Sequence, residues 1–131
     1  MKLPQRRNEA KQSLISVVDD DESVRESLPD LIKEFGFTVQ AFSSAEEFLA
    51  SDSVGRTRCL ILDIAMRGMS GFDLQRALKD RRLTIPIVFI TALKDEALRT
   101  RALEQGAAGF LHKPFSDTAL LEALNIALRV N

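Results

Sequence analysis

Five side chains that could bind a cation or a phosphoryl group stand at or just after short apolar runs of this 131-residue sequence: Asp19, Asp20, Asp63, Thr91 and Lys113. Carboxylates that share a site repel one another, so they need a compensating cation in order to stay ionised. A hard divalent ion such as Mg²⁺ takes oxygen ligands and usually only one or two protein carboxylates. An ammonium suits phosphoryl oxygens, and a hydroxyl can donate to another of them. The set could hold a phosphoryl group during its transfer to or from a carboxylate.

The segments that must position these side chains alternate between two sequence patterns. Short apolar runs rich in β-branched residues predict buried strands at residues 14–18, 37–42, 59–63, 86–91 and 108–111. Segments with helical spacing of apolar residues lie between and after them, at 23–35, 43–51, 71–82, 95–105 and 116–130. Five successive strand–helix units predict an α/β fold, a parallel sheet with helices on both faces. Ligands of such sheets bind beyond the carboxyl ends of the strands, where the five side chains are expected to meet.

Local signals mark several helix ends. Gly36 is a natural residue just beyond a helix, and Ser116 is the expected N-cap of the last helix. Ser43 and Glu46 have the spacing of a capping box.

The amino-acid composition limits the class of protein to which this chain can belong. Hydrophobic residues make up 45% of the chain and charged residues 28%, as in ordinary globular domains, and the length suits one domain. No apolar run approaches the roughly 20 residues of a membrane span, so no membrane partner is expected. The single cysteine, Cys59, is expected in a strand core; it cannot form an internal disulfide, which fits a cytoplasmic location.

Four motifs resemble the receiver domain of bacterial two-component response regulators: VVDDDESVRESL, LILDIAMRGMSG, VFITA and GAAGFLHKPF. The resemblance implies a flavodoxin-like, doubly wound (βα)5 fold with a five-stranded parallel sheet over residues 14–131. Residues 1–13 carry four basic side chains and no periodic apolar pattern, so they are expected to form a basic flexible tail.

The resemblance also implies how the acidic residues act. Asp63 would be the phosphoacceptor, which takes its phosphoryl group from the phosphohistidine of a histidine kinase or a phosphotransfer domain. Mg²⁺, with Mn²⁺ as an alternative, would be bound directly by Asp20, Asp63 and the backbone carbonyl of Ala65, and by Asp19 largely through water. The chain would then be a signalling switch with self-catalysed phosphorylation and dephosphorylation, and not an enzyme acting on other substrates.

Further roles follow from the same resemblance. Thr91 matches the switch hydroxyl, Lys113 the phosphate-binding lysine, and Phe110 the aromatic side chain that changes rotamer on activation. The bond between Lys113 and Pro114 is expected to be cis. Arg67 stands where many members of the family have proline, so the loop after Asp63 is expected to be less rigid.

The signal would leave through the surface formed by the helices at 95–105 and 116–130 and the strand at 108–111. Phosphorylation-dependent homodimerisation through this surface is an expectation of the same kind. The net charge of −1 offers no attraction for nucleic acid, and the last expected helix ends near residue 130, so direct binding of nucleic acid by this chain is not expected.

Two other readings of the sequence remain open. The chain could be a receiver-fold interaction module that works without phosphorylation, although such modules can lose the acidic, hydroxyl and lysine groups present here. Asp19 and Asp21 also form a D-x-D after the first strand, as in phosphatases of the haloacid dehalogenase kind. Ser23 stands where that family has threonine or valine, which disfavours the phosphatase reading. His112, the only histidine, is expected to be a surface residue without a catalytic role.

Overall fold

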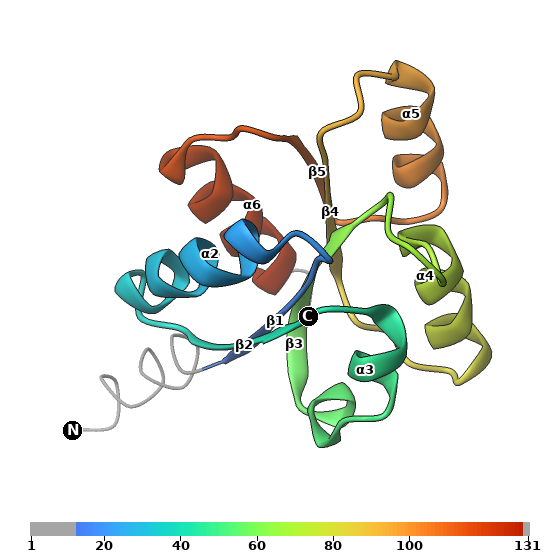
Figure 1. Cartoon of the computed structure of the whole chain (residues 1–131), viewed down its shortest axis with the longest axis horizontal. Coiled ribbons are helices and arrows are strands. Elements are labelled where there is room, and N and C mark those ends of the chain that lie inside the picture. The colour runs from blue at the N-terminus through green and yellow to red at the C-terminus, as the bar shows by residue number, and fades with distance from the viewer. Residues whose placement is uncertain (1–12, 130–131) are drawn as a thin grey trace.

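The computed structural model describes residues 13–129, which form a parallel sheet between two layers of helices (Figure 1). The strands are β1 (Leu14–Val18), β2 (Thr38–Phe42), β3 (Thr57–Asp63), β4 (Ile87–Thr91) and β5 (Gly109–His112). The helices are α2 (Glu22–Glu34), α3 (Ala45–Leu49), the 3₁₀ helix η1 (Asp52–Gly55), α4 (Gly71–Asp80), α5 (Glu96–Glu104) and α6 (Asp117–Arg129). The tail expected at residues 1–13 lies outside the described residues, apart from Ser13.

The strands lie in the order β2-β1-β3-β4-β5, and every neighbouring pair is parallel. This is the order of flavodoxin-like folds, in which the direction of winding reverses between β1 and β3. The predicted doubly wound α/β fold is therefore confirmed. Because β1 and β3 are neighbours, the residues that follow them come together at one end of the sheet.

The two faces of the sheet bury separate cores. Leu60 and Leu62 of β3 pack on the side of α3 and α4, whereas Cys59 and Ile61 pack on the side of α2 and α6 (Figure 1). All four side chains are fully buried. Cys59 is thus a core residue, as predicted, and burial raises the pKa of its thiol to about 12. The thiol is therefore protonated at neutral pH, which removes its nucleophilic form.

β2 differs from the predicted buried strand. It lies at one edge of the sheet, and Thr38, Gln40 and Ala41 are exposed, whereas Phe42 is buried. The prediction that all five strands are covered on both sides is wrong for this strand. An edge strand has one neighbour and reduced cover by helices, so it tolerates polar side chains along most of its length.

Most expected helix ends agree with the structure, with one correction. Gly36 follows α2 with a φ of 100°, and the Ser116 hydroxyl accepts a hydrogen bond from the Ala119 N–H near the start of α6. The Ser43–Glu46 capping box, however, is wrong by one residue. Ser44 caps α3 by accepting from the Glu47 N–H, and the Glu47 carboxylate accepts from the Ser43 N–H. Because Ser43 and Ser44 are adjacent, as are Glu46 and Glu47, the spacing of a capping box fits either pair.

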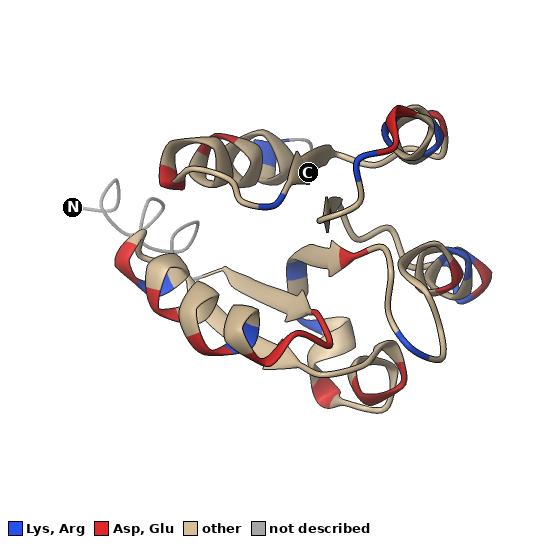
Figure 2. Ribbon diagram, turned by 45° about the horizontal axis from the view of Figure 1, so that its top comes forward, with Lys and Arg blue, Asp and Glu red and all other residues tan. Residues whose placement is uncertain are grey.

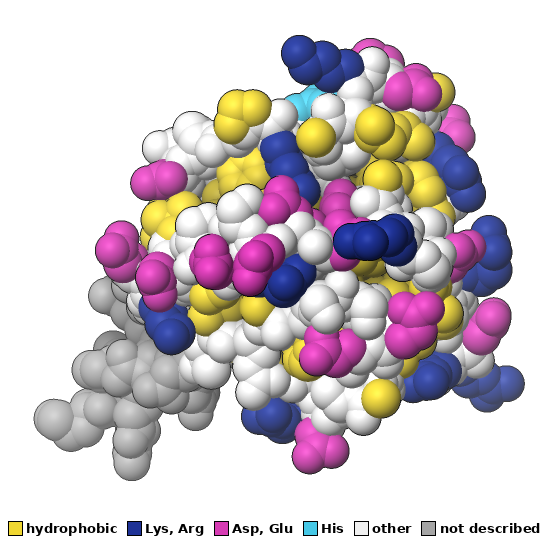
Figure 3. All heavy atoms as spheres, viewed as in Figure 1, with side chains coloured by type: hydrophobic (Ala, Val, Ile, Leu, Met, Phe, Trp, Pro, Cys, Tyr) yellow, Lys and Arg dark blue, Asp and Glu magenta, His cyan; other side chains and the backbone are white. Residues whose placement is uncertain are grey.

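The surface carries charges of both signs. Acidic and basic side chains are interspersed over the face seen in Figure 3, in keeping with a net charge of −1. Among the helices in residues 13–129, none has the length and apolar character needed to cross a bilayer.

The start of α4 packs against the backbone at the end of β3. Ser70 and Asp73 form a capping box at this helix start, and the Gly71 N–H donates to the carbonyl of Ile64 at 2.9 Å. A Cβ atom at Gly71 would lie 2.5 Å from the backbone oxygen of Asp63. The absence of a side chain at residue 71 thus allows the helix to approach the strand end that carries Asp63.

We expect Gly71→Ala to lower the free energy of unfolding by about 1–3 kcal/mol, because the added methyl group must displace backbone atoms. Urea denaturation followed by circular dichroism measures this change. Gly55→Ala is the matched control, since a Cβ at Gly55 meets no atom within 4 Å. A loss of stability in the control equal to that in Gly71→Ala would contradict the close approach as its cause.

Candidate functional site

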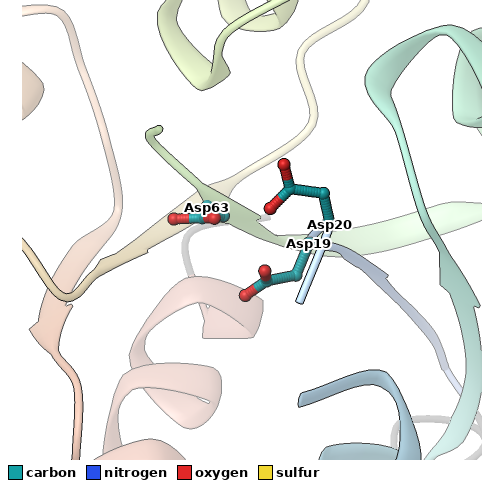
Figure 4. A group of neighbouring side chains, drawn as sticks. All are labelled: Asp19, Asp20 and Asp63. Atoms are coloured by element: carbon teal, nitrogen blue, oxygen red, sulfur yellow. The ribbon is translucent and has the colours of Figure 1, made fainter. Parts of the chain in front are cut away.

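Three carboxyl groups meet at the carboxyl end of the sheet. Asp19 and Asp20 directly follow β1, and Asp63 is the last residue of β3. An oxygen atom from each of the three lies within 4.8 Å of the others. Figure 4 shows the three side chains beside one another at the strand ends, and the acidic segments near the centre of Figure 2 mark the same place. The predicted meeting of these residues is what the structure shows.

Lys113 brings the ammonium group of this site. Its Nζ lies 2.7 Å from Asp19 Oδ2 and 3.9 Å from Asp63 Oδ2. The residue follows β5, two strands away from β3, and its peptide bond to Pro114 is cis, the isomer that the resemblance implies. The Asp19 side chain is fully buried, so its close ion pair with Lys113 compensates a charge removed from water.

The arrangement shifts the pKa of Asp63. Burial, together with the neighbouring Asp19 carboxylate, raises this pKa to about 7 against the opposing effect of Lys113. A single ammonium among three carboxylates therefore does not neutralise the site. Asp21 lies outside this cluster of carboxylates, and hydrogen bonds from the side chain and backbone of Ser23 hold its pKa below the ordinary value.

The donor set suits a hard divalent cation. Three carboxylates offer oxygen ligands in one place, and an added cation would offset their repulsion. Ala65, whose carbonyl is the further ligand implied by the family resemblance, lies in the exposed loop two residues beyond Asp63. The residues present thus fit Mg²⁺, which would supply positive charge to the site.

Thr91 ends β4 beside this cluster. Its neighbour Ile90 pairs with Asp63 in the register of β3 and β4. The Thr91 side chain is fully buried, and its Oγ1 accepts a hydrogen bond of 3.0 Å from the Leu93 N–H. Because the hydroxyl accepts this bond, its own proton remains to be donated elsewhere.

Phe110 lies inside the protein on β5. The ring is 6% exposed and belongs to the core on the α4 side of the sheet. The guanidinium of Arg99, on α5, lies over the ring at 4.8 Å from its centre. Phe110 thus connects the sheet to α5, on the side of the site away from β1.

Two contacts at the site were not expected from the sequence. The backbone N–H of Arg67 donates to Asp20 Oδ2 at 3.1 Å, a bond that proline at this position could not form. His112 is half-buried, and its Nε2 lies 2.9 Å from the carbonyl oxygen of Leu93. Both contacts join segments far apart in the sequence. Each involves a main-chain group, which every residue has, so no spacing of residue types predicts them.

The model of the response regulator receiver domain family matches residues 15–125. The transcriptional regulatory protein TdiR of Thauera aromatica is 40% identical over 119 residues, which are 91% of this chain and 52% of TdiR. The response regulator protein TodT of Pseudomonas putida is 42% identical over 118 residues, 90% of this chain and 52% of TodT. The chain thus spans about half the length of the curated relatives it matches.

Solved structures agree with these relatives. The crystal structure of FixJ-N superimposes with a TM-score of 0.81 at 38% identity, covering 90% of this chain and 94% of that one. The response regulator StyR gives a TM-score of 0.83 at 46% identity, covering 90% of this chain and 60% of that one.

We expect the stability of the metal-free protein to depend on pH through Asp63. The pKa of this group is about 7 in the folded chain and near 3.8 when unfolded, so the folded state keeps the proton up to a higher pH than the unfolded state does. The contribution of Asp63 to stability is then fully present below about pH 4 and is lost as the pH rises to about 7. Relative to wild type, Asp63→Asn should gain roughly 1–3 kcal/mol of stability between pH 4.5 and 8.

Urea denaturation in EDTA at several pH values measures this difference. Asp80→Asn, at the exposed end of α4, is the control and should run parallel to wild type. A difference between Asp63→Asn and wild type that does not change with pH would contradict the raised pKa.

Proposed function

This chain belongs to the response regulator receiver family of two-component signalling, and from that premise we propose that Asp63 accepts a phosphoryl group in a Mg²⁺-dependent reaction. The observation that carries the proposal is the meeting of Asp19, Asp20 and Asp63 within 4.8 Å, with Lys113 bridging Asp19 and Asp63. The proposed donor is the phosphohistidine of a histidine kinase or of a phosphotransfer domain.

In the proposed reaction, a carboxylate oxygen of Asp63 attacks the phosphorus atom of the phosphohistidine. An O–P bond forms, the N–P bond breaks, and its electron pair leaves with the imidazole nitrogen. The product is an acyl phosphate on Asp63. Chemistry of this kind depends mainly on position and on neutralised charge, both of which the site residues can supply.

The proposed metal ligands are Asp20, Asp63 and the carbonyl of Ala65, with Asp19 acting largely through water. Bound Mg²⁺, or Mn²⁺ in its place, would neutralise charge on the phosphoryl oxygens and on the carboxylates. The Arg67 N–H supports this set because it holds one oxygen of Asp20, which leaves the other oxygen for a ligand.

Two groups are proposed to hold the transferred phosphoryl group. The Lys113 ammonium already lies 3.9 Å from Asp63, and the Thr91 hydroxyl, with its acceptor role filled by Leu93, would donate its proton to a phosphoryl oxygen. Dephosphorylation is proposed to be self-catalysed at the same groups: a water molecule attacks the phosphorus atom, the O–P bond to Asp63 breaks, and the Asp63 carboxylate and inorganic phosphate are released.

The signal is proposed to leave through α5, β5 and α6, with Phe110 changing rotamer as Thr91 moves. Phe89 and Phe110 are paired in the register of β4 and β5, and Arg99 of α5 stacks on Phe110, so these elements share contacts. The exposed large apolar side chains within residues 13–129 belong to this region: Leu93, Leu103 and Ile126. We propose that a partner or a second copy of the chain binds over this region.

The proposed output is control of transcription. TdiR carries the name of a transcriptional regulatory protein, as does FixJ of Rhizobium meliloti, which is 40% identical over 113 residues. We propose that binding to DNA belongs to a part of the protein other than residues 13–129, since this chain covers 52% of TdiR and 55% of FixJ.

The test is incubation with acetyl phosphate followed by measurement of the intact mass. With Mg²⁺, wild type should gain one phosphoryl group, and the gain should disappear in EDTA and in Asp63→Asn. Asp80→Asn keeps the site intact and should gain the group as wild type does. A gain that survives in Asp63→Asn would contradict the assignment of the phosphoacceptor. No gain from acetyl phosphate or from a phosphohistidine donor would favour an interaction module that works without phosphorylation.

A further inference from the structure

The side chain of His112 reaches from the end of β5 to the loop that follows β4. His112 pairs with Thr91 in the register of the two strands. Its Nε2 lies 2.9 Å from the carbonyl oxygen of Leu93, which can only accept, so the imidazole donates this hydrogen bond. The imidazole therefore fixes a main-chain group in the loop two residues beyond Thr91.

Leu93 transmits this restraint to Thr91. The N–H of Leu93 donates to Thr91 Oγ1 at 3.0 Å, and its carbonyl accepts from His112. Both peptide groups that flank the Cα atom of Leu93 are thus held, one by Thr91 and the other by His112. Without the imidazole, the carbonyl of Leu93 would lose this hydrogen bond, and the bond to Thr91 would be left to restrain the residue.

The imidazole is itself held by packing. Its ring meets the ring of Phe110 edge to face, with 5.4 Å between their centres, and the guanidinium of Arg99 covers Phe110 from the α5 side. The Lys113 N–H donates to the Thr91 carbonyl at 2.8 Å, so the main chains at the ends of β5 and β4 are also connected next to His112. The sequence predicts a surface residue without a catalytic role, and the structure adds these contacts to a half-buried side chain.

We propose that His112 is a positioning residue for the Thr91 hydroxyl. His112 holds the carbonyl of Leu93, and the N–H of Leu93 then occupies the acceptor side of the Thr91 hydroxyl. The proton of that hydroxyl is therefore left to be donated to a phosphoryl oxygen on Asp63. The inference rests on the proposed function, because it assigns His112 a role in holding the phosphoryl group on Asp63.

The test compares the binding of beryllofluoride, a phosphoryl mimic, in the presence of Mg²⁺. His112→Phe keeps an aromatic ring against Phe110 but has no donor, whereas His112→Gln places an amide N–H near the position of Nε2. Isothermal titration should show binding about fivefold weaker in His112→Phe, the worth of one neutral hydrogen bond, and within about twofold of wild type in His112→Gln. Mg²⁺ affinity without beryllofluoride should be equal in all three proteins.

Two results of this titration would overturn the inference. Binding in His112→Phe equal to wild type would show that the donor has no role, and an equal loss in His112→Gln would show that the ring and not the hydrogen bond matters. In both cases wild type still binds beryllofluoride, so the proposed function stands. If wild type itself binds no beryllofluoride with Mg²⁺, the proposed function fails and the inference fails with it.

The single histidine provides a second measurement that needs no variant of His112. In ¹⁵N NMR spectra of the metal-free protein, the imidazole should carry its proton on Nε2, and its signal should shift when Mg²⁺ and beryllofluoride are added. Asp63→Asn is the control and should show no such shift. An unprotonated Nε2, or a wild-type signal that does not respond to bound beryllofluoride, would overturn the inference even if His112→Phe does not fold.

Discussion

Three carboxylates share one ammonium at the carboxyl end of this sheet, and the chemistry of the site depends on that imbalance of charge. Asp19 is fully buried and paired with Lys113 at 2.7 Å, so this ammonium is already engaged by one of the carboxylates. Asp63 lies 3.9 Å from the same ammonium and has a pKa near 7 as a result of burial and of its acidic neighbour. A cation at this place would lower the repulsion among the carboxylates and favour the ionised, nucleophilic form of Asp63.

The order of the strands creates this imbalance and also limits it. The adjacency of β1 and β3 brings the acidic residues together, and β4 and β5 add a hydroxyl and an ammonium from the other side. The loops are then tied to the site by main-chain bonds: Arg67 to Asp20, Leu93 to Thr91, and Lys113 to the Thr91 carbonyl. These bonds connect groups that belong to different strand ends, so the loops that carry the site residues restrain one another.

The sequence predicts the fold and the polar cluster because both depend on simple patterns. Apolar runs such as residues 59–63 mark the central strands, and a polar residue at the end of each run marks the site. The exposure of β2 was not predictable in the same way, since being at an edge is a property of the strand order and not of residues 38–42. The bonds from Arg67 and His112 were also missed, because they end on atoms that lie far away in the sequence or that every residue possesses.

The most direct test of the central claim is a crystal structure of the protein with Mg²⁺ and beryllofluoride. We expect beryllofluoride on a carboxylate oxygen of Asp63, and Mg²⁺ at about 2.0–2.1 Å from oxygens of Asp20 and Asp63. We also expect contacts from the Lys113 ammonium and the Thr91 hydroxyl to fluorine atoms. A structure in which beryllofluoride binds elsewhere, or in which Mg²⁺ occupies a site away from these carboxylates, would contradict this claim.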